Sequence, residues 1–319
     1  MKLKKAMCLI IAIMIISVLA GCSVKDVKNY TFAAASPGGT YYAMSGGFST
    51  IFGEIMDGYS LNVQTTAGSA ENIRLVNSGE TDMGLANGSE LYWAWNDEGV
   101  FQGQNIEDIR IVGFGWTNIY HCVVLEKSGI NNFEDFKGKN VGVGPQGSAA
   151  AIFNEILLSE GGVWNEVSPV YLPPGDQVSA MKDGNLDVFG YFSGLPLSLI
   201  IDLSSVKDVK LLDIGKLGDK FGFSEKYPFY ETSIIPAGTY VGQEEDIVSY
   251  SNLTYIIANK DVPEETVYEF LKALYSEEGL DHMHSVHTRS SELSVGSIEK
   301  MVDIIGIPMH QGAVRFIQE

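Results

Sequence analysis

The chain has 319 residues and a formal net charge of −19, because 40 aspartates and glutamates face only 21 lysines and arginines. Such an acidic balance argues against nucleic acid or an anionic membrane surface as a partner, since both repel a negative protein. An anionic ligand would therefore have to be held by local groups. The length is sufficient for two domains.

The N-terminus has the pattern of a signal peptide. A basic start, Met1-Lys2-Leu3-Lys4-Lys5, precedes an apolar run that is short for a membrane span. The run ends in Leu19-Ala20-Gly21-Cys22, which resembles a bacterial lipobox. We expect cleavage after residue 21, lipidation of Cys22, a tether over residues 22–29 and anchoring to the outer face of the cell membrane. Removing three lysines would change the charge from −19 to −22.

Cysteine usage predicts neither a disulfide nor a metal site. Cys8 lies in the expected signal peptide, which leaves Cys122 as the one free thiol after lipidation of Cys22. Metal-like residues gather only at His282, His284 and His287. Positions two apart do not share a helix face, so we interpret this cluster as a solvated helix end outside any binding site, with no metal and no cofactor.

A strand–loop–helix unit near the N-terminus organises the rest of the chain. Strand-like Tyr30–Ala35 is followed by Ser36-Pro37-Gly38-Gly39-Thr40-Tyr41-Tyr42 and then by a helix-like segment from Ala43 to Met56. Pro-Gly-Gly permits a tight turn, and the first N–H groups of the helix lack intrahelical partners. Such a corner suits an anion, although for this stretch alone an ordinary tight turn is the favoured interpretation.

The same unit recurs along the chain. Its turns are Thr66-Ala67-Gly68-Ser69, Asn87-Gly88-Ser89, Gly144-Pro145-Gln146-Gly147-Ser148 and Phe192-Ser193-Gly194-Leu195-Pro196. Strands that alternate with helices favour a parallel α/β sheet, whose ligands bind beyond the carboxyl ends of the strands. The repeated turns would lie together at that edge.

Two similarly built lobes are predicted from a second repeat. After Gly79 and again after Gly184, two residues lead to an aspartate, Asp82 or Asp187, and then to an apolar strand. Strand-like Tyr120–Glu126 and Leu253–Asn259 have the character of two strands that cross at a hinge. We assign residues 30–120 and 253–319 to lobe 1 and 121–252 to lobe 2. A single larger α/β domain is the alternative.

Enzyme motifs are weak or missing. Gly142-Val143-Gly144-Pro145-Gln146-Gly147 matches a dinucleotide fingerprint, but the next strand ends in Pro173-Pro174-Gly175 where an acidic residue is needed. No phosphate loop, nucleophile elbow or acid–base pair is present, so we expect no enzyme. Arg74 either clamps a ligand carboxylate or packs against its own lobe.

Several stretches together resemble the TAXI-type solute receptors of TRAP transporters. These stretches are Gly38–Tyr42, Gly68–Leu75, Gly79–Met83, Gly144–Ser148, Ile235–Tyr240 and Ile307–Ala313. The resemblance implies a two-lobed periplasmic-binding-protein fold of type II. It also implies a monomer that delivers a small, often glutamate-like carboxylate to a TRAP membrane permease. The chain departs from the pattern at Asn87 and at Gln311.

The resemblance and the turns place the ligand site on the same residues. The predicted contacts are Gly39, Thr40, Tyr41, Ser69, Asn72, Asn87, Gln146, Gly147, Ser148, Phe192, Ser193 and Pro196. The main rival is a receptor of an ABC importer for a thiamine-precursor or sulfonate-type ligand. An enzyme built on this scaffold and a sensor module are two further candidates.

Overall fold

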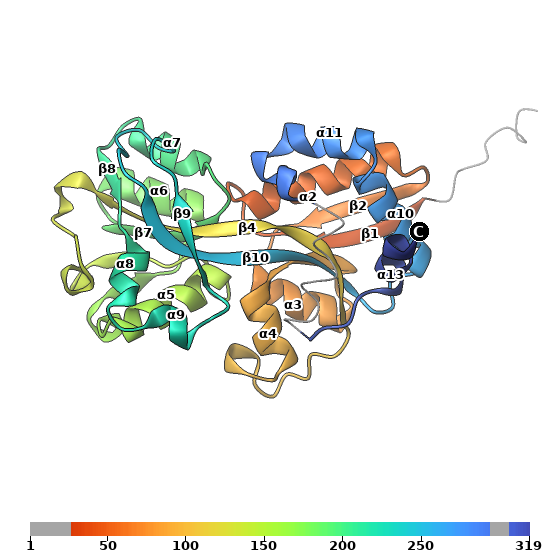
Figure 1. The fold of residues 1–319 in the computed structure, drawn as a ribbon, viewed down its shortest axis with the longest axis horizontal. Helices are drawn as coiled ribbons and strands as arrows, with labels where there is room; N and C mark the ends of the chain where they lie inside the picture. The colour runs from red at the N-terminus through yellow and green to blue at the C-terminus, as the bar shows by residue number, and fades with distance from the viewer. Residues whose placement is uncertain (1–26, 294–305) are drawn as a thin grey trace, which may run out of the picture.

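The computed structural model describes residues 27–293 and 306–319 of the chain. The predicted signal peptide, Cys22 and most of the expected tether lie outside these residues. Two lobes lie side by side, and two long strands, β4 (Ile109–Leu125) and β10 (Ile247–Asn259), run through both (Figure 1). This is the predicted α/β architecture with two crossing strands. The residue boundaries assigned to the lobes stay a prediction.

Lobe 1 contains the N-terminal elements and those that return after β10 (Figure 1). Its elements are β1 (Lys28–Ala33), α2 (Thr40–Thr50), the π-helical turn η1 (Ile51–Ile55), β2 (Tyr59–Gln64), α3 (Ser69–Ser78), β3 (Met83–Asn87), α4 (Gly88–Trp95), η2 (Gly99–Phe101), α10 (Glu264–Leu274), α11 (Glu277–Val286), η6 (Thr288–Glu292) and α13 (Gln311–Gln318).

Lobe 2 is built from the segment between the crossing strands (Figure 1). Its elements are η3 (Glu126–Ser128), η4 (Phe133–Phe136), β5 (Asn140–Gly142), α5 (Ala149–Glu160), η5 (Trp164–Glu166), β6 (Ser168–Val170), α6 (Pro174–Asp183), β7 (Val188–Ser193), α7 (Ser198–Ser204), β8 (Val209–Leu211), α8 (Ile214–Asp219), α9 (Phe223–Lys226) and β9 (Glu231–Ile235).

One sheet continues through both lobes. Its strands follow the order β2-β1-β3-β10-β4-β7-β5-β6, with β8 paired to β4 and β9 paired to β10. In each lobe three strands with intervening helices carry the parallel pairings, namely β1 with β2 and β3, and β5 with β6 and β7. The antiparallel pair of β4 and β10 joins the two halves.

The matched aspartates close the same contact in both lobes. The carboxylate of Asp82 accepts hydrogen bonds from the backbone N–H of Thr31 at 2.7 Å and from its hydroxyl at 2.7 Å. In lobe 2 the carboxylate of Asp187 accepts from the backbone N–H of Asn140 at 2.8 Å. Each aspartate stands just before one strand and binds the residue beside it on the neighbouring parallel strand, which explains the repeat in the sequence.

The crossing strands are longer than predicted, because each begins well before the segment with obvious strand character. Gly115 and Asn118 interrupt the apolar run of β4, yet the strand is continuous from Ile109 to Leu125. A Cβ atom on Gly115 would come 3.2 Å from the Cγ2 atom of Thr254 on β10. Glycine therefore serves close packing of the two strands rather than a turn.

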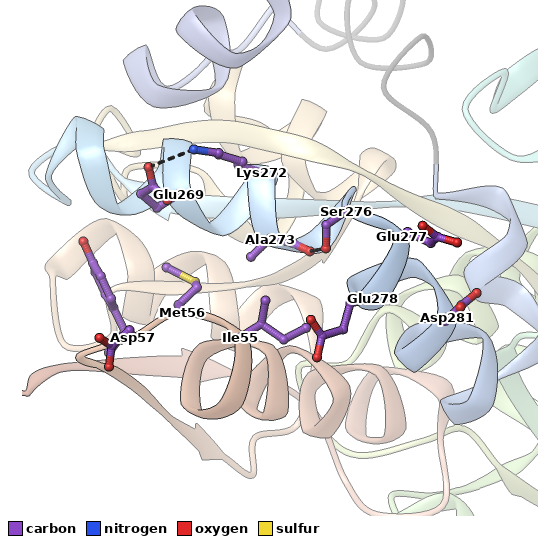
Figure 2. A pocket seen from close by; sticks show the side chains of 11 residues that line it. Ile55, Met56, Asp57, Glu269, Lys272, Ala273, Ser276, Glu277, Glu278 and Asp281 are labelled. Carbon is purple, nitrogen blue, oxygen red and sulfur yellow. Dashed lines mark hydrogen bonds and ion pairs between the residues drawn. The ribbon is translucent and has the colours of Figure 1, made fainter.

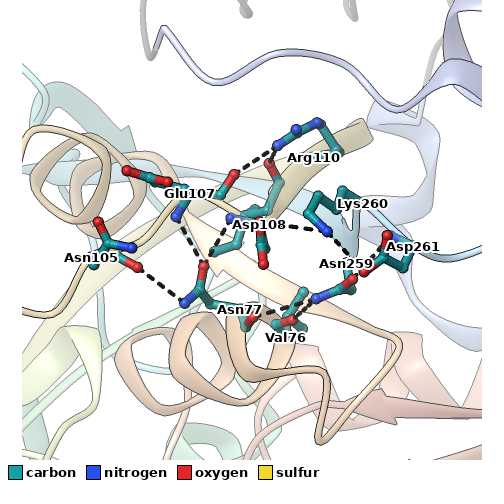
Figure 3. Close-up of polar contacts among 10 residues, drawn as sticks. Val76, Asn77, Asn105, Glu107, Asp108, Arg110, Asn259, Lys260 and Asp261 are labelled. Atoms are coloured by element: carbon teal, nitrogen blue, oxygen red, sulfur yellow. Dashed lines mark hydrogen bonds and ion pairs between the residues drawn. The ribbon is translucent and has the colours of Figure 1, made fainter.

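Polar contacts fix the lobe-1 ends of the crossing strands (Figure 3). The Oδ1 atom of Asn77, near the end of α3, accepts from the backbone N–H of Glu107 at 3.0 Å and of Asp108 at 2.9 Å. The Nδ2 atom of Asn259 donates to the carbonyl of Val76 at 2.7 Å. The start of β4 and the end of β10 are thus both tied to one helix.

Candidate functional site

Loops from both lobes meet at the carboxyl ends of the parallel strands and enclose a small space, here called the central space. Its volume is about 30 Å³. The residues that line it are Ala35, Gly39, Thr40, Tyr41, Ala67, Gly68, Ser69, Asn87, Asn118, Ser148, Ala149, Ala150, Tyr191 and Phe192. The lining contains hydroxyls, amides and rings, and none of these residues carries a charge.

Two helices of lobe 1, α2 and α3, begin beside this space, and neither N-terminus has a side-chain cap. Neither Gly39, which precedes α2, nor Gly68, which precedes α3, provides a side-chain cap. The first N–H groups of these helices therefore have no capping oxygen from the preceding side chain. Gly68 has a φ of +123°, a conformation that favours glycine, and a Cβ atom there would make an ordinary contact of 3.7 Å with the Cβ atom of Ser148 of lobe 2.

Helix α2 begins earlier than predicted. The sequence predicts a helix from Ala43, whereas α2 begins at Thr40, because Gly39 is already extended with φ −98° and ψ 162°. Thr40 and Tyr41 therefore belong to the first helical turn rather than to the loop. Their side chains are buried against the site, with exposed fractions of 4% and 9%.

A hydrogen-bonded floor joins three elements of lobe 1 below the central space. The hydroxyl of Tyr41 donates to the Oδ1 atom of Asn87, and the Oγ atom of Ser69 accepts from the backbone N–H of Asn87 at 3.1 Å. Burial raises the pKa of Tyr41, so its hydroxyl keeps its proton at neutral pH. The floor presents neutral dipoles that donate or accept.

Asn118 of β4 belongs to this floor and was missed by sequence reasoning. Its Nδ2 atom donates to the Oγ1 atom of Thr254 at 2.5 Å, and its Oδ1 atom accepts from the indole of Trp116 at 2.9 Å. The one available signal was an amide side chain inside the apolar run of β4. A polar residue in a buried strand usually has a partner or a role.

Direct bonds between the lobes cross the site at Thr40. The Oγ1 atom of Thr40 lies 2.9 Å from the Oγ atom of Ser193 and accepts from the backbone N–H of Gly194 at 2.9 Å. Nearby, the hydroxyl of Thr288 donates to the carbonyl of Leu195 at 2.9 Å. The lobes are therefore in contact in this structure.

Tyr240 supports the lobe-2 wall from behind. Its hydroxyl accepts from the backbone N–H of Leu197 at 2.8 Å and lies 2.8 Å from the Nε2 atom of His121 on β4. Burial lowers the pKa of His121 to about 3, so the ring stays neutral. The Ile235–Tyr240 stretch therefore ties the loop after β7 to a crossing strand.

Seven of the twelve predicted contact residues line the central space: Gly39, Thr40, Tyr41, Ser69, Asn87, Ser148 and Phe192. An eighth, Ser193, is hydrogen-bonded to Thr40. Asn72 faces the interior of lobe 1 instead. Its amide donates to the carbonyls of Ala34 and Leu85, both at 2.7 Å, and it is fully buried. Asn72 holds two strand ends together and has no donor left for a ligand.

Gln146 and Gly147 lie at a separate opening between the lobes, which we call the Arg74 opening. It is also lined by Ala70, Glu71, Arg74, Val100, Ala151, Ile152, Glu155 and Tyr171. Arg74 donates to Gln104 and to the carbonyls of Ala70 and Val100, all within lobe 1. Of the two roles left open for Arg74, packing against its own lobe is the one observed.

The histidine cluster is divided between two places, and no histidine lines the central space, so the expectation that the cluster lies outside the site stays a prediction. His284 is exposed on α11, but His287 lines an opening of about 410 Å³ together with Thr40, Ser193 and Pro196. α11 packs against α2, which carries its C-terminal end to the interlobe contact. Within the described residues, no group of histidine, cysteine and carboxylate side chains could hold a metal ion.

A wider hollow of about 1020 Å³ lies on lobe 1 alone, between η1 and the helices α10 and α11 (Figure 2). Most of the charged side chains in its lining are carboxylates, namely Asp57, Glu269, Glu277, Glu278 and Asp281. Lys272 is the one cation in this lining. This hollow is larger than the central space, but its negatively charged lining would repel an anion, and no residue of lobe 2 lines it. We therefore place the candidate site in the central space.

In the described part of the chain, no helix has the length and apolar character required to cross a membrane. Cys122, on β4, is buried, and burial raises the pKa of its thiol.

Solved structures with a similar fold come from periplasmic proteins. The periplasmic binding protein BugD matches with a TM-score of 0.54 at 11% identity, covering 91% of this chain and 96% of that one. A structure described as a periplasmic transporter matches with a TM-score of 0.52 at 14% identity, covering 90% and 96%. The alkanesulfonate-binding protein SsuA from Xanthomonas axonopodis pv. citri, bound to MOPS, matches with a TM-score of 0.47 at 14% identity, covering 92% and 84%.

At these identities the likeness concerns the fold. It agrees with the predicted two-lobed periplasmic-binding-protein architecture. A family model described as the NMT1-like family matches residues 32–319, which is nearly all of the described chain. The chain therefore belongs to the NMT1-like family.

Proposed function

We propose that this protein is an extracytoplasmic receptor that captures one small organic anion between its lobes and delivers it to a membrane importer. The observation that carries the proposal is the composition of the central space. Its lining combines unoccupied helix N-termini of lobe 1 with hydroxyl and amide side chains from both lobes. N–H and O–H dipoles bind carboxylate and sulfonate oxygens without a fixed counter-charge.

Capture requires the lobes to separate. The central space of about 30 Å³ corresponds to roughly one water molecule, which is too small for an amino acid or an alkanesulfonate. A ligand would replace the bonds of Thr40 to Ser193 and Gly194 and would then be held by both lobes. Closure around the ligand is how such binding stabilises one conformation over another.

Two ligand classes share this chemistry, and each belongs to a transporter class. The resemblance of the turn motifs favours a glutamate-like carboxylate and a TRAP permease. The match to the NMT1-like family fits the rival better, namely a receptor of an ABC importer with a sulfonate-type or thiamine-precursor ligand. We therefore favour the ABC importer as the partner and test both ligand classes.

An enzymatic role has less support than a receptor role. Near the site, burial is the main cause of the shifted pKa values of Tyr41, Glu90 and His121. No nucleophile is paired with a base among the residues that line the central space. His287, which lines the neighbouring opening with Thr40, uses its Nδ1 atom to accept from the backbone N–H of Arg289.

Isothermal calorimetry on the mature chain tests the ligand class. The panel contains glutamate, 2-oxoglutarate, succinate and ethanesulfonate, and native mass spectrometry of freshly purified protein looks for a retained ligand. We expect one panel member to bind with one-to-one stoichiometry. Thr40→Ala and Ser69→Ala should each weaken that binding about 5- to 150-fold, because loss of one buried partner costs about 1–3 kcal/mol.

His284→Ala is the matched control, since this side chain is exposed on α11, and it should leave affinity unchanged. Binding that survives both Thr40→Ala and Ser69→Ala would place the ligand elsewhere. Failure of every anion to bind, together with a cationic ligand found by mass spectrometry, would overturn the proposed ligand class.

A further inference from the structure

Glu90 is a buried carboxyl group that the proposed capture of a ligand does not explain. It lies in the first turn of α4 with an exposed fraction of 0%. Neither of its carboxyl oxygens has a hydrogen-bond partner among the residues that the structure describes. A buried carboxylate without partners is very costly, so such a group keeps its proton. Burial accordingly raises the pKa of Glu90 to about 8.

The surroundings of Glu90 connect it to the central space. On its own segment it follows Ser89 and Asn87, and both side chains act on its pKa in the direction opposite to burial. Asn87 is also the residue whose Oδ1 atom accepts from Tyr41 in the floor of the site. A negative charge on Glu90 would therefore lie close behind the group that faces an anionic ligand.

The titratable groups that face Glu90 from other elements are tyrosines. Tyr41 reaches it from α2, and Tyr230 reaches it from the segment between α9 and β9; for both, the charge on Glu90 raises the tyrosine pKa. The hydroxyl of Tyr230 is buried and also lacks a partner in the described chain. None of the groups that act on the pKa of Glu90 is a cation.

Lobe 2 contacts α4, the helix that carries Glu90, through aromatic rings. The ring of Phe229 lies 5.0 Å from that of Tyr92 and 5.8 Å from that of Trp93, measured between centroids. Tyr230 lies 6.4 Å from Trp93 by the same measure. Separation of the lobes would break these contacts, because Tyr92 and Trp93 belong to α4 of lobe 1 while Phe229 and Tyr230 belong to the segment after α9 of lobe 2.

We propose that Glu90 makes closure of the lobes dependent on a proton: the closed form holds Glu90 as a neutral acid, and its ionisation favours the open form. When the lobes part, water reaches the carboxyl group and its pKa returns toward the ordinary value. The effect of Glu90 on ligand affinity rests on the proposed function. Its effect on lobe closure does not require a ligand.

The sign of the effect follows from linkage. The closed form binds a proton more tightly than the open form, so the ratio of closed to open molecules is highest below the ordinary glutamate pKa and falls as pH rises toward about 8. Within that window the ratio falls up to about tenfold for each pH unit, and above it the ratio is constant.

Histidines near the lobe contact act in a different part of the pH range. Burial lowers the pKa of both His121 and His287, so both are neutral above pH ~6.5, the ordinary histidine value. The range from about pH 6.5 to 8 therefore reports on Glu90. Over this range the closed-to-open ratio should fall by roughly fifteenfold, because the fall levels off near pH 8.

Small-angle X-ray scattering of the ligand-free mature chain between pH 6.5 and 8.5 tests the proposal. The radius of gyration of the wild type should rise as the lobes separate, and Glu90→Gln should stay compact throughout, because an amide cannot ionise. Glu134→Gln is the matched control: Glu134 is exposed on lobe 2, and this variant should follow the wild type. Glu90→Met, with similar volume and no charge, should behave as Glu90→Gln does.

A rise in Glu90→Gln and Glu90→Met equal to that of the wild type would overturn the proposal, and so would a wild type of constant radius. Calorimetry with the anion that binds best adds a second reading. Wild-type affinity should fall between pH 6.5 and 8, whereas that of Glu90→Gln should not. If no anion binds at any pH, the proposed function fails while the scattering result still decides the role of Glu90.

Discussion

The two lobes share one plan, but they treat the helix N-termini at the site differently. In lobe 1, α2 and α3 follow Gly39 and Gly68, and neither glycine provides a cap. In lobe 2, Ser148 precedes α5, and its Oγ atom accepts from the backbone N–H of Ala151 at 3.1 Å. Lobe 1 thus leaves donors open for a ligand, whereas lobe 2 has already used one of its donors. Under the proposed function, we therefore expect lobe 1 to hold the ligand and lobe 2 to close over it.

The largest expected effects test whether the lobes are one cooperative unit. Phe48 of lobe 1 packs against Phe32 and Phe270, and Phe153 of lobe 2 packs against Tyr120, Phe192 and Tyr230. Both phenylalanines are fully buried. Phe48→Ala and Phe153→Ala should each lower the free energy of unfolding by about 3–5 kcal/mol.

Urea unfolding followed by circular dichroism measures both variants. We expect a single transition that shifts in each case, because β4 and β10 carry the sheet through both lobes. Two transitions, of which each variant shifts only one, would show that the lobes unfold independently.

A smaller effect should separate the matched aspartates. Asp82 accepts two hydrogen bonds from Thr31, whereas Asp187 accepts one from the backbone of Asn140. Asp82→Ala should therefore cost about 2–4 kcal/mol of unfolding free energy, and Asp187→Ala about 1–2 kcal/mol. Both aspartates are half-buried, so burial does not explain a difference. Equal costs in the same urea experiment would contradict this account of the two strand contacts.

The smallest effects come from exchanging the two kinds of cap. Gly39→Ser gives lobe 1 a capping oxygen and should raise stability by a few tenths of a kcal/mol, because serine is a slightly better cap than glycine. The new Cβ atom would lie 3.6 Å from the ring of Tyr191, an ordinary contact. Ser148→Gly should lower stability by a similar amount.

For Gly39→Ser, we expect the affinity for the anion to fall although the stability rises. The new hydroxyl occupies N–H donors of α2, so the variant should bind the anion more weakly although it is more stable. Thermal unfolding with and without the anion measures both quantities. Tighter binding by Gly39→Ser would show that the open N-terminus of α2 is not used for the ligand.

Much of the fold follows from local sequence signals. Alternating strands and helices, with turns rich in glycine and serine, predict the parallel halves of the sheet, and the repeated aspartates indicate two similar lobes. The crossing strands were placed correctly at Tyr120–Glu126 and Leu253–Asn259, but their full length was not. Gly115 and Asn118 are unfavourable in an isolated strand and are tolerated because β10 packs against them.

The candidate site was only partly predictable, because the turns identify the loops but not where each side chain points. Asn72 is polar and follows the same turn as Ser69, yet its amide donates hydrogen bonds to two strand ends and does not face the central space. Gln146 and Ser148 are two residues apart, yet they line different openings. His287 reaches Thr40 only through the packing of α11 on α2, which sequence spacing does not encode.

The continuous pair of β4 and β10 determines which parts of the site move. A hydrogen-bonded ribbon resists stretching but tolerates added twist, and its register shifts near Leu253 and again between Ile256 and Ile257 mark irregular points along it. We expect any relative motion of the lobes to be a rotation about the ribbon, in which the displacement of a residue increases with its distance from the ribbon. Asn118 and Thr254 lie on the ribbon itself, so such a rotation would move them less than the loops at the rim of the central space. A ligand entering from the rim would meet an already assembled floor.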